Sequence, residues 1–297
     1  GQVIYGEAGD WSGWSVDLSS DGRVVAVGSI YNQCDNDGSG IVRVYRFDKG
    51  TTTWNQTGNG IQGENPYDFS GAAVSLSGDG RTVAIGAPVN GANGLYSSGH
   101  VRVYRLDGDD SGDWTQLGGS VNGDGEMDGL GSAAALSEDG STLAVASPFD
   151  DDGGVDSGSV RVRRWNGTDW ERIGGTIRGE SAGDQLGFSV DVSADGTILA
   201  IGSPYHDVEG KLDCGSTRVY EWNEDASDWE PLGQTISGEN AGDQSGSSVA
   251  LSADGETVAV GANFNDGING EDSGSASVYV LDRGASYWRK AGRDIDG

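Results

Sequence analysis

Short runs in which apolar and polar residues alternate recur along the whole chain, and each run ends at a turn signal. In the last sixth of the chain the runs cover residues 247–252, 257–261, 275–280 and 287–292, and Asp254-Gly255 lies between the first two. Alternation with a period of two predicts half-buried β-strands, and Asp-Gly between two such runs predicts a hairpin turn. No segment of useful length has the periodicity of a helix, so the pattern predicts an all-β protein.

The four-strand unit is repeated along the chain with a period of about sixty residues. Each copy opens on the phrase G-E-x-x-G-D or a close variant, and the copies span 6–62, 63–122, 123–178, 179–237 and 238–297. A single unit of this kind cannot bury both faces of its sheet, so neighbouring units must stack. Four antiparallel strands repeated with glycine and aromatic markers predict a β-propeller with five four-stranded blades, built as one repeat domain over 1–297.

Tryptophan marks the fourth strand of every copy, at Trp54, Trp114, Trp170, Trp229 and Trp288. A large aromatic side chain at a fixed repeat position is expected to pack between neighbouring blades. Trp11 and Trp14 have no counterparts in the other copies. They are therefore the better candidates for a surface contact.

The composition adds a strong negative charge to this picture. The 297 residues include 47 acidic and 18 basic side chains, which gives a net charge of −29. Such a chain should repel nucleic acid and anionic lipid, and it suits a cation-rich extracellular setting, although solubility alone also explains the charge. No stretch approaches the ~20 apolar residues of a membrane span, so direct membrane insertion is not expected. Because the chain starts inside a repeat, we expect any targeting segment to have been removed or left out.

Several phrases resemble FG-GAP repeats, which build the propeller of integrin α-subunit heads and of many secreted bacterial and algal proteins. They are G-S-S-V-A-L-S at 246–252, V-A-I-G-A-P at 83–88 and S-G-H-V-R-V-Y at 98–104, and L-G-F at 186–188 is the nearest match to the literal F-G. The resemblance covers nearly the whole chain and implies a propeller. The resemblance says little about the function of the chain.

In that family many blades bind calcium in the first hairpin, and here the hairpin departs from the pattern. The loops that begin at Asp17 and Asp191 are shortened, and an apolar residue replaces the final acidic ligand. Calcium needs about six to eight oxygens, so the site is not carried over and a plain Asp-Gly turn is expected instead. A calcium ion is possible in the acidic loop that carries Asp150, Asp151, Asp152 and Asp156, where the alternative is a solvated loop with Asx turns.

Two further sets of charged residues recur at fixed positions. The acids that close the G-E-x-x-G-D phrase could form a cation-binding ring at one mouth of a central channel, or could each cap their own turn; they are Asp10, Asp68, Asp128, Asp184 and Asp243. The arginines of the third strand are expected to pair with carboxylates across strands, or to form a binding stripe; they are Arg43, Arg102, Arg161 and Arg218.

Catalytic motifs are absent from the sequence. His100 and His206 are the only histidines and fall in different repeats, and neither G-x-S-x-G nor H-E-x-x-H occurs. The sequence therefore predicts that the protein is not an enzyme. Asn55 and Asn166 begin glycosylation sequons, and Asn166, in an expected exposed turn, is the better acceptor.

Cys34 and Cys214 are the only cysteines, and they lie in equivalent loops of the first and fourth copies. Those blades would not be neighbours in a five-blade ring, so an intramolecular disulfide is not expected. Unpaired thiols would be available to bond a neighbouring chain.

These observations favour an extracellular or cell-surface, non-enzymatic propeller. The first hypothesis is an adhesion or recognition module that binds a protein or glycan, by resemblance to integrin heads. The second is a structural subunit of a filament or surface matrix made of copies of itself. It rests on the two chain ends, because 1–6 and 292–297 both match the element that closes each repeat. The third is a repeat lectin, which would need exposed tryptophans.

Overall fold

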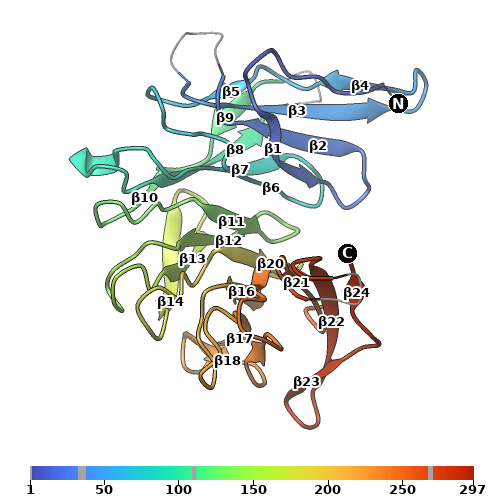
Figure 1. Cartoon of the computed structure of the whole chain (residues 1–297). Helices are drawn as coiled ribbons and strands as arrows, with labels where there is room; N and C mark the ends of the chain where they lie inside the picture. Colours follow the sequence, from blue (N-terminus) through green and yellow to red (C-terminus); the bar gives the residue numbers. More distant parts are fainter. Residues whose placement is uncertain (1, 33–37, 109–111, 267–269) are drawn as a thin grey trace. The chain divides into compact units, whose positions relative to one another are not determined.

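The computed structural model describes residues 2–32, 38–108, 112–266 and 270–297, and in these the chain is built from β-strands (Figure 1). The single helical element among them is a 3₁₀ turn at Ala92–Gly94. The strands form five antiparallel sheets, one in each sequence repeat. The prediction of an all-β propeller fold with five antiparallel blades is confirmed.

Each blade is a meander in which the first four strands pair in sequence order. The first blade contains β1 (Ser12–Leu18), β2 (Val24–Ser29), β3 (Ile41–Asp48), β4 (Thr53–Gln56) and β5 (Ile61–Gln62). The second contains β6 (Ala73–Leu76), β7 (Thr82–Ala87), β8 (His100–Leu106), β9 (Trp114–Gln116) and β10 (Val121–Asn122). The third contains β11 (Ala133–Leu136), β12 (Thr142–Ser147), β13 (Ser159–Trp165) and β14 (Trp170–Arg178).

The last two blades follow the same plan. The fourth contains β15 (Ser189–Val192), β16 (Ile198–Ser203), β17 (Ser216–Asn223), β18 (Asp228–Pro231) and β19 (Ile236–Ser237). The fifth contains β20 (Ser245–Leu251), β21 (Thr257–Ala262), β22 (Ser275–Asp282), β23 (Tyr287–Lys290) and β24 (Ile295–Asp296). The two-residue strands β5, β10, β19 and β24 pair with the third strand of their blade and were not expected from the sequence. In the third blade the single long strand β14 takes the place of the last two.

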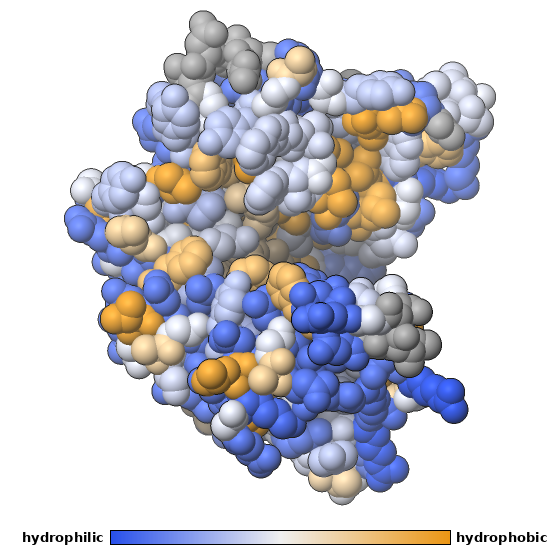
Figure 2. Space-filling view, viewed as in Figure 1, coloured by the Kyte–Doolittle hydropathy of each residue, from blue (hydrophilic) through white to orange (hydrophobic). Residues whose placement is uncertain are grey.

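The chain forms two compact units. The first comprises Gly1–Leu143 with Arg163–Glu171, and the second comprises Ala144–Val162 with Arg172–Gly297. No helix among the described residues is long and apolar enough to cross a membrane. Hydrophilic residues cover most of the visible surface of the second unit, whereas hydrophobic residues gather over the β1–β2 hairpin of the first (Figure 2). Val16 and Leu18 of β1 are among the exposed apolar side chains there.

The hydrophobic core of each unit lies between neighbouring blades. In the first unit, Val24 and Val44 of the first blade share a buried cluster with Ile85 and Trp114 of the second. In the second unit, side chains of β16 and β17 share a cluster with side chains of β21, β22 and β23. Burying apolar surface between sheets is what makes one blade depend on the next, as the repeat predicts.

The repeated tryptophans fix this stacking. The indole Nε1 of Trp114 donates to the carbonyl oxygen of Thr57 in the preceding blade at 2.9 Å, and Trp288 donates to Leu232 at 2.7 Å. Trp170 makes the same bond to Leu117 at 2.9 Å. The expected packing between blades is therefore observed, with a hydrogen bond added. Trp11 and Trp14, by contrast, are both 57% exposed, and their rings stack at 5.9 Å.

Part of the high glycine content follows from close contact between blades. A Cβ on Gly86 of β7 would lie 2.0 Å from the carbonyl oxygen of Gly131, where the next blade begins. A Cβ on Gly202 of β16 would meet the carbonyl oxygen of Gly246 at the same distance. Neither approach leaves room for a side chain, so only glycine fits at these positions.

The first hairpin of each blade closes as a plain turn. Asp21 Oδ1 accepts hydrogen bonds from the Ser19 hydroxyl at 2.8 Å and from the Arg23 N–H at 3.0 Å, and Gly22 follows with φ 68°. The hydrogen bond from Ser19 is the largest cause of a lowered pKa of Asp21, and the one from Arg23 is the next largest. The carboxylates that head the two aligned hairpins bond the next blade instead. Asp17 Oδ2 accepts from the Leu76 N–H, and Asp191 Oδ2 accepts from the Leu251 N–H, each at 2.6 Å.

Candidate polar site of the fourth blade

Five repeat positions bring polar side chains together within each blade. They are the glutamate and the last aspartate of the opening motif, the residue that starts the loop after the second strand, the first residue of the third strand and the arginine two residues later. We call this set the polar cluster. It consists of Glu64, Asp68, Asn90, His100 and Arg102 in the second blade, and of Glu180, Asp184, His206, Ser216 and Arg218 in the fourth.

The aspartate of the motif closes its own turn. Asp68 Oδ2 accepts from the Asn65 N–H at 2.8 Å, Asp184 Oδ2 from the Ser181 N–H at 2.9 Å, and Asp243 Oδ2 from the Asn240 N–H at 2.8 Å. The donor lies three residues before the acid in each case, so these three aspartates cap their own turns. All five motif aspartates, Asp10, Asp68, Asp128, Asp184 and Asp243, are buried. A cation ring formed by them stays a prediction.

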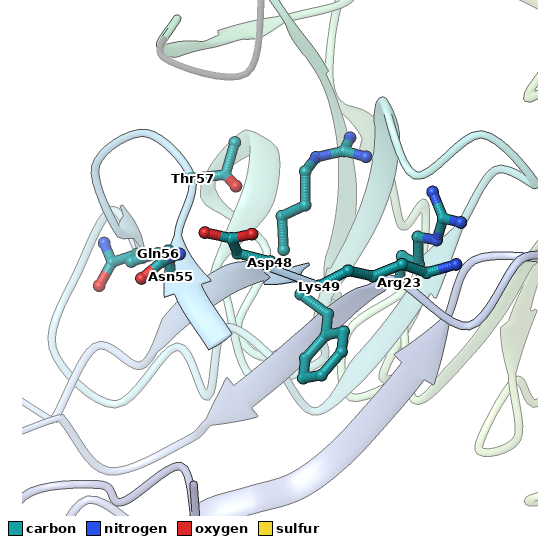
Figure 3. Close-up of a pocket in the computed structure, with 8 residues that line it drawn as sticks. Arg23, Asp48, Lys49, Asn55, Gln56 and Thr57 are labelled. Carbon is teal, nitrogen blue, oxygen red and sulfur yellow. The ribbon is translucent and has the colours of Figure 1, made fainter. Parts of the chain in front are cut away.

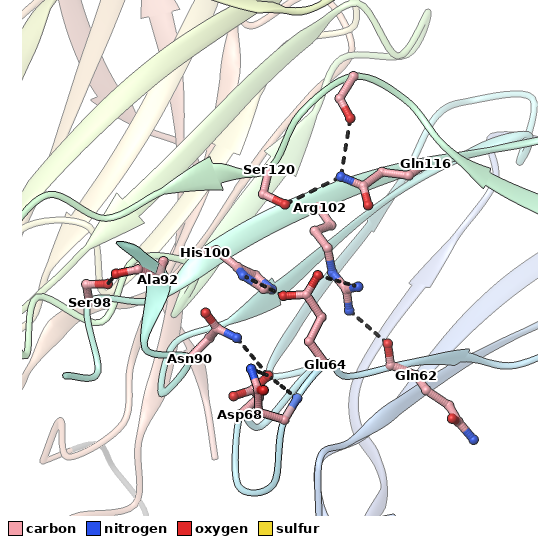
Figure 4. Close-up of polar contacts among 12 residues, drawn as sticks. Gln62, Glu64, Asp68, Asn90, Ala92, Ser98, His100, Arg102, Gln116 and Ser120 are labelled. Atoms are coloured by element: carbon pink, nitrogen blue, oxygen red, sulfur yellow. Dashed lines mark hydrogen bonds and ion pairs between the residues drawn. The ribbon is translucent and has the colours of Figure 1, made fainter. Parts of the chain in front are cut away.

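The second-blade cluster is tightly bonded (Figure 4). Asn90 donates to Asp68 Oδ2 at 2.7 Å, and Arg102 donates to the Gln62 carbonyl at 2.8 Å while it faces Glu64 at 3.4 Å. His100 Nδ1 lies 3.8 Å from the Glu64 carboxylate, and the side chain is 2% exposed. Burial, with repulsion from Arg102, lowers the pKa of His100 to about 4. His100 is therefore a neutral side chain inside the blade, out of reach of a substrate.

The fourth-blade cluster carries its histidine at a different position, and this histidine is partly accessible. His206 stands where the second blade has Asn90, and Ser216 stands where it has His100. His206 Nδ1 and the Ser216 hydroxyl are 2.9 Å apart, while His206 Nε2 lies 3.7 Å from Glu180 Oε2. The imidazole thus has one nitrogen fixed in the protein and the other beside an exposed carboxylate.

An arginine and a cavity complete this site. Arg218 Nη1 donates to Glu180 Oε1 at 2.8 Å, and Nη2 donates to the Arg178 carbonyl at 3.3 Å, which fixes the carboxylate beside the imidazole. A cavity of about 130 Å³ opens next to them, lined in part by Glu180, Arg218, Tyr220 and Gln234. Burial raises the pKa of Tyr220, so its hydroxyl is a neutral hydrogen-bond donor.

The carboxylate of Glu180 and the fixed cation of Arg218 thus line a small cavity, and His206, which does not line it, lies 3.7 Å from Glu180. If the Nδ1–H of His206 donates to Ser216, the lone pair of Nε2 faces Glu180 and is free to take a proton. His206 does not stand out in the sequence as a site residue, because the two histidines fall in different repeats. Aligning the repeats position by position would have shown His206 in a polar position that it shares with Asn32, Asn90, Asp150 and Asn265.

The predicted arginine pairs are present. Arg43 Nη1 lies 3.5 Å from Asp10 Oδ2, and Arg161 Nη2 lies 3.6 Å from Asp150 Oδ2. Together with Arg102 and Arg218, these arginines hold the acids of their own blade. Their partners come from the loops around the strand and not from a directly opposed strand residue.

The acidic loop of the third blade bonds largely to itself. Asp150 Oδ2 accepts from Ser159 at 2.7 Å and Oδ1 from the Asp152 N–H at 2.8 Å. Asp151 Oδ1 accepts from the Asp156 N–H at 2.8 Å, and the Asp152 carboxylate faces Arg178 at 3.0 Å. No group of three or more His, Cys, Asp or Glu in the described part of the chain is placed to hold a metal ion. Calcium binding here stays a prediction.

The remaining predicted sites are placed as follows. Asn166 lies in an exposed turn, where its Oδ1 accepts from the Thr168 N–H at 2.8 Å, and Asn55 lies exposed in β4. Glycosylation of either stays a prediction. Cys214 is buried with a free thiol whose pKa is raised by burial. Cys34 lies outside the described residues, so the absence of a disulfide between them also stays a prediction.

Solved structures share this fold at low sequence identity, whereas no curated protein sequence matches the chain. The periplasmic gluconolactonase of Pseudomonas aeruginosa superposes with a TM-score of 0.61 at 18% identity, over 98% of this chain and 73% of that chain. A candidate 6-phosphogluconolactonase from Bacteroides uniformis gives a TM-score of 0.54 at 12% identity, over 96% and 85%. One from Bacteroides fragilis gives 0.52 at 11%, over 96% and 84%.

These neighbours correct the functional expectation. All three are named as lactonases, so the prediction of a non-enzymatic protein for adhesion, filament building or glycan recognition is wrong. The physical reason is that a propeller does not itself specify a function. Missing motifs were weak grounds for excluding an enzyme, because a polar site in a blade is assembled from positions far apart in the sequence.

The family resemblance, in contrast, is confirmed. Residues 235–279 match the FG-GAP repeat family, and this stretch runs from the end of the fourth blade through most of β22 in the fifth. An antiparallel sheet with the same order of its first four strands recurs in the other repeats. The match covers one repeat, and it supports the resemblance of this chain to FG-GAP β-propellers.

Proposed function

We propose that this protein is a hydrolase that opens cyclic esters of sugar acids at the polar cluster of the fourth blade. The observation that carries the proposal is the placement of His206, whose Nδ1 lies 2.9 Å from Ser216 while Nε2 faces Glu180 at 3.7 Å. The lactonase names of the structural neighbours support the choice of an ester in a ring as substrate.

In the proposed reaction His206 acts as a general base. Ser216 accepts the Nδ1 proton and so leaves the Nε2 lone pair available. Nε2 takes a proton from a water molecule, whose oxygen attacks the carbonyl carbon of the lactone. The ring C–O bond then breaks, and the leaving oxygen takes the proton back from His206 to become a hydroxyl. The product is a hydroxy acid, whose carboxyl group then ionises and releases one proton to the solvent, so one water is consumed and one proton released for each ring opened.

The other groups of the cluster position the substrate and balance charge. Arg218 supplies a fixed positive charge beside the oxygen that becomes negative during the attack. Glu180, held by Arg218, stabilises the imidazolium that forms when Nε2 takes the proton, and the Tyr220 hydroxyl offers a hydrogen bond to a hydroxyl group of a sugar acid. Ser216 is 1% exposed, so it is a positioning residue and not the nucleophile.

The proposal includes a location outside the cytoplasm. The periplasmic name of the Pseudomonas aeruginosa neighbour and the net charge of −29 support an exported protein. Detection of the native protein in periplasmic, culture and cytoplasmic fractions of its source tests this part of the proposal.

The test is hydrolysis of glucono-δ-lactone, followed by acid release in a pH-stat above the buffer background. We expect the wild-type protein to be active, and His206→Gln to lower kcat by about 10²-fold or more, which is typical for the loss of a general base. Glu180→Gln should lower kcat/KM by about tenfold, since the negative charge that stabilises the protonated His206 is lost.

The fifth blade provides the matched control. Glu239 occupies the position of Glu180 and pairs with Lys290 at 2.8 Å, but Asn265 replaces the histidine there. Glu239→Gln should leave the rate unchanged. A wild-type protein that does not exceed the background, or a His206→Gln variant as fast as wild type, would refute the proposal.

A further inference from the structure

We propose that the first blade contains a separate binding site for a small hydroxylated molecule that carries a sulfate or phosphate ester. The site is a cavity of about 410 Å³ at the β3–β4 turn, lined by Arg23, Arg46, Phe47, Asp48, Lys49, Asn55, Gln56 and Thr57. In the view of Figure 3, Arg23 and Lys49 lie on one side of the cavity, and Asn55 and Gln56 lie on the other. All of these residues belong to the first unit, and the proposal does not depend on the lactonase proposal.

The charge of this cavity is opposite to that of the protein. Three of its eight lining residues are basic, Arg23, Arg46 and Lys49, in a chain with a net charge of −29 and only 18 basic residues. The one acid among them, Asp48, is engaged in its own turn, since its Oδ1 accepts from the Gly50 N–H at 2.8 Å and its Oδ2 from the Thr51 hydroxyl at 2.9 Å. Arg23 also lies 3.6 Å from the exposed carboxylate of Asp21, which does not line the cavity, so the three cations outnumber the two nearby acids by one.

The repeat supplies an internal comparison. The same place in the fourth blade is a cavity of about 400 Å³, and there Glu221, Glu224, Asp225 and Glu230 are among the lining residues. Arg46, Lys49 and Asn55 of the first blade correspond to Glu221, Glu224 and Glu230. Two cavities of nearly equal size, at equivalent positions of two blades, thus have linings of opposite charge. The basic lining is a property of the first blade and not a consequence of the fold.

The uncharged lining indicates what accompanies the anion. Asn55 and Gln56 present side-chain amides, and Gln56 keeps its Oε1 as an acceptor while its Nε2 donates to the Gly58 carbonyl at 3.1 Å. Phe47 adds an apolar ring that packs against Trp54 at 5.2 Å. Amides and one aromatic face suit the hydroxyl groups and the apolar face of a sugar ring, and the volume exceeds what a bare oxyanion fills.

The expected affinity is modest and depends on salt. Arg23 and Lys49 are exposed, so their attraction for an anion is screened by added ions. We expect a Kd of about 0.1–1 mM in low salt, weakening severalfold at physiological ionic strength. Because Asn55 begins a sequon, a glycan on it would fill the same cavity, and the test requires protein made without glycosylation.

The experiment is isothermal titration of the whole protein with glucose 6-phosphate, glucose 6-sulfate and glucose. Either ester should bind, whereas glucose should not. Arg23→Glu and Lys49→Glu, which change exposed side chains, should each raise the Kd of the ester about tenfold or more. The matched control is Glu224→Lys in the acidic cavity of the fourth blade. It should leave the Kd of the ester within about twofold, since this residue does not line the proposed site.

A second titration identifies the source of the ester. Tighter binding of a sulfated galactan oligosaccharide than of glucose 6-phosphate assigns the site to sulfated polysaccharide, and the reverse assigns it to sugar phosphates. Absence of binding by both esters and by the oligosaccharide would overturn the proposal. Equal binding of glucose and its esters, or an unchanged Kd in both charge-reversal variants with native circular dichroism, would overturn it as well.

Discussion

Replacing Trp288 by Phe should destabilise the protein more than the same change at Trp229, although the two residues occupy the same repeat position. Trp288 is 1% exposed and Trp229 is 6% exposed. Trp288 Nε1 donates to the Leu232 carbonyl at 2.7 Å. Trp229 Nε1 is buried and has no hydrogen-bond partner among the described residues. Both substitutions remove a similar part of an indole ring, so the hydrogen bond is the main difference between them.

The size of the difference follows from that bond. Trp288→Phe leaves the buried Leu232 carbonyl without its donor, which costs about 1–3 kcal/mol. Trp229→Phe removes a buried donor that has no partner, and this part of the change is nearly neutral or slightly stabilising. The two variants should therefore differ by about 1–3 kcal/mol in the free energy of unfolding. At about 2–4 °C per kcal/mol for a chain of roughly this size, Trp288→Phe should melt several degrees lower.

The assay is thermal and urea unfolding of both variants and the wild type, followed by far-UV circular dichroism. Both residues lie in the second compact unit, so the two variants report on the same part of the molecule. A Trp229→Phe variant that loses as much stability as Trp288→Phe would refute the assignment of interblade stability to the indole hydrogen bond.

Three further predictions concern titration and metal. The pKa of His100 is lowered to about 4, so the unfolded chain takes up this proton at a higher pH than the folded protein, and the protein should lose on the order of 3 kcal/mol of stability between pH 6.5 and 4. The variant His100→Ser carries the residue that three other blades have at this position, and its Tm should fall less between pH 7 and 4.5 than that of the wild type. Equal losses of Tm would contradict the burial argument. Burial raises the pKa of Asp17, so the stability that its protonated carboxyl contributes is present below the pKa of the unfolded chain and is lost as pH rises through the folded-state pKa. Asp17→Asn keeps the acceptor for the Leu76 N–H and should raise Tm more at pH 7 than at pH 4. A larger gain in Tm at pH 4 would contradict this direction of the pKa shift. If calcium binds the loop at 150–156, excess calcium should raise Tm relative to a chelator, and an unchanged midpoint speaks against that site.

The strands, the hairpin turns and the number of blades could be predicted from the order of residues alone. Alternation with period two is a local property, so residues 257–261 predict β21 (Thr257–Ala262) without knowledge of the rest of the chain. The Asp-Gly turns are equally local, since Asp21 closes its turn with Ser19 and Arg23. The two-residue strands such as β24 escaped prediction because two residues carry no periodicity and pair only once β22 is in place.

The partners of the polar residues, in contrast, depend on how the sheets pack and could not be predicted from the sequence. Asp17 and Asp191 head hairpins that resemble degraded calcium loops, but their carboxylates reach the backbone of the next blade, a contact between residues about sixty positions apart. His206, Ser216 and Glu180 carry no motif in the chain, because the loop and strands of one blade bring them together from separate positions. A hydrogen-bonding side chain takes its role from the partners within reach of it. Those partners are fixed by packing between sheets, which the local pattern does not contain.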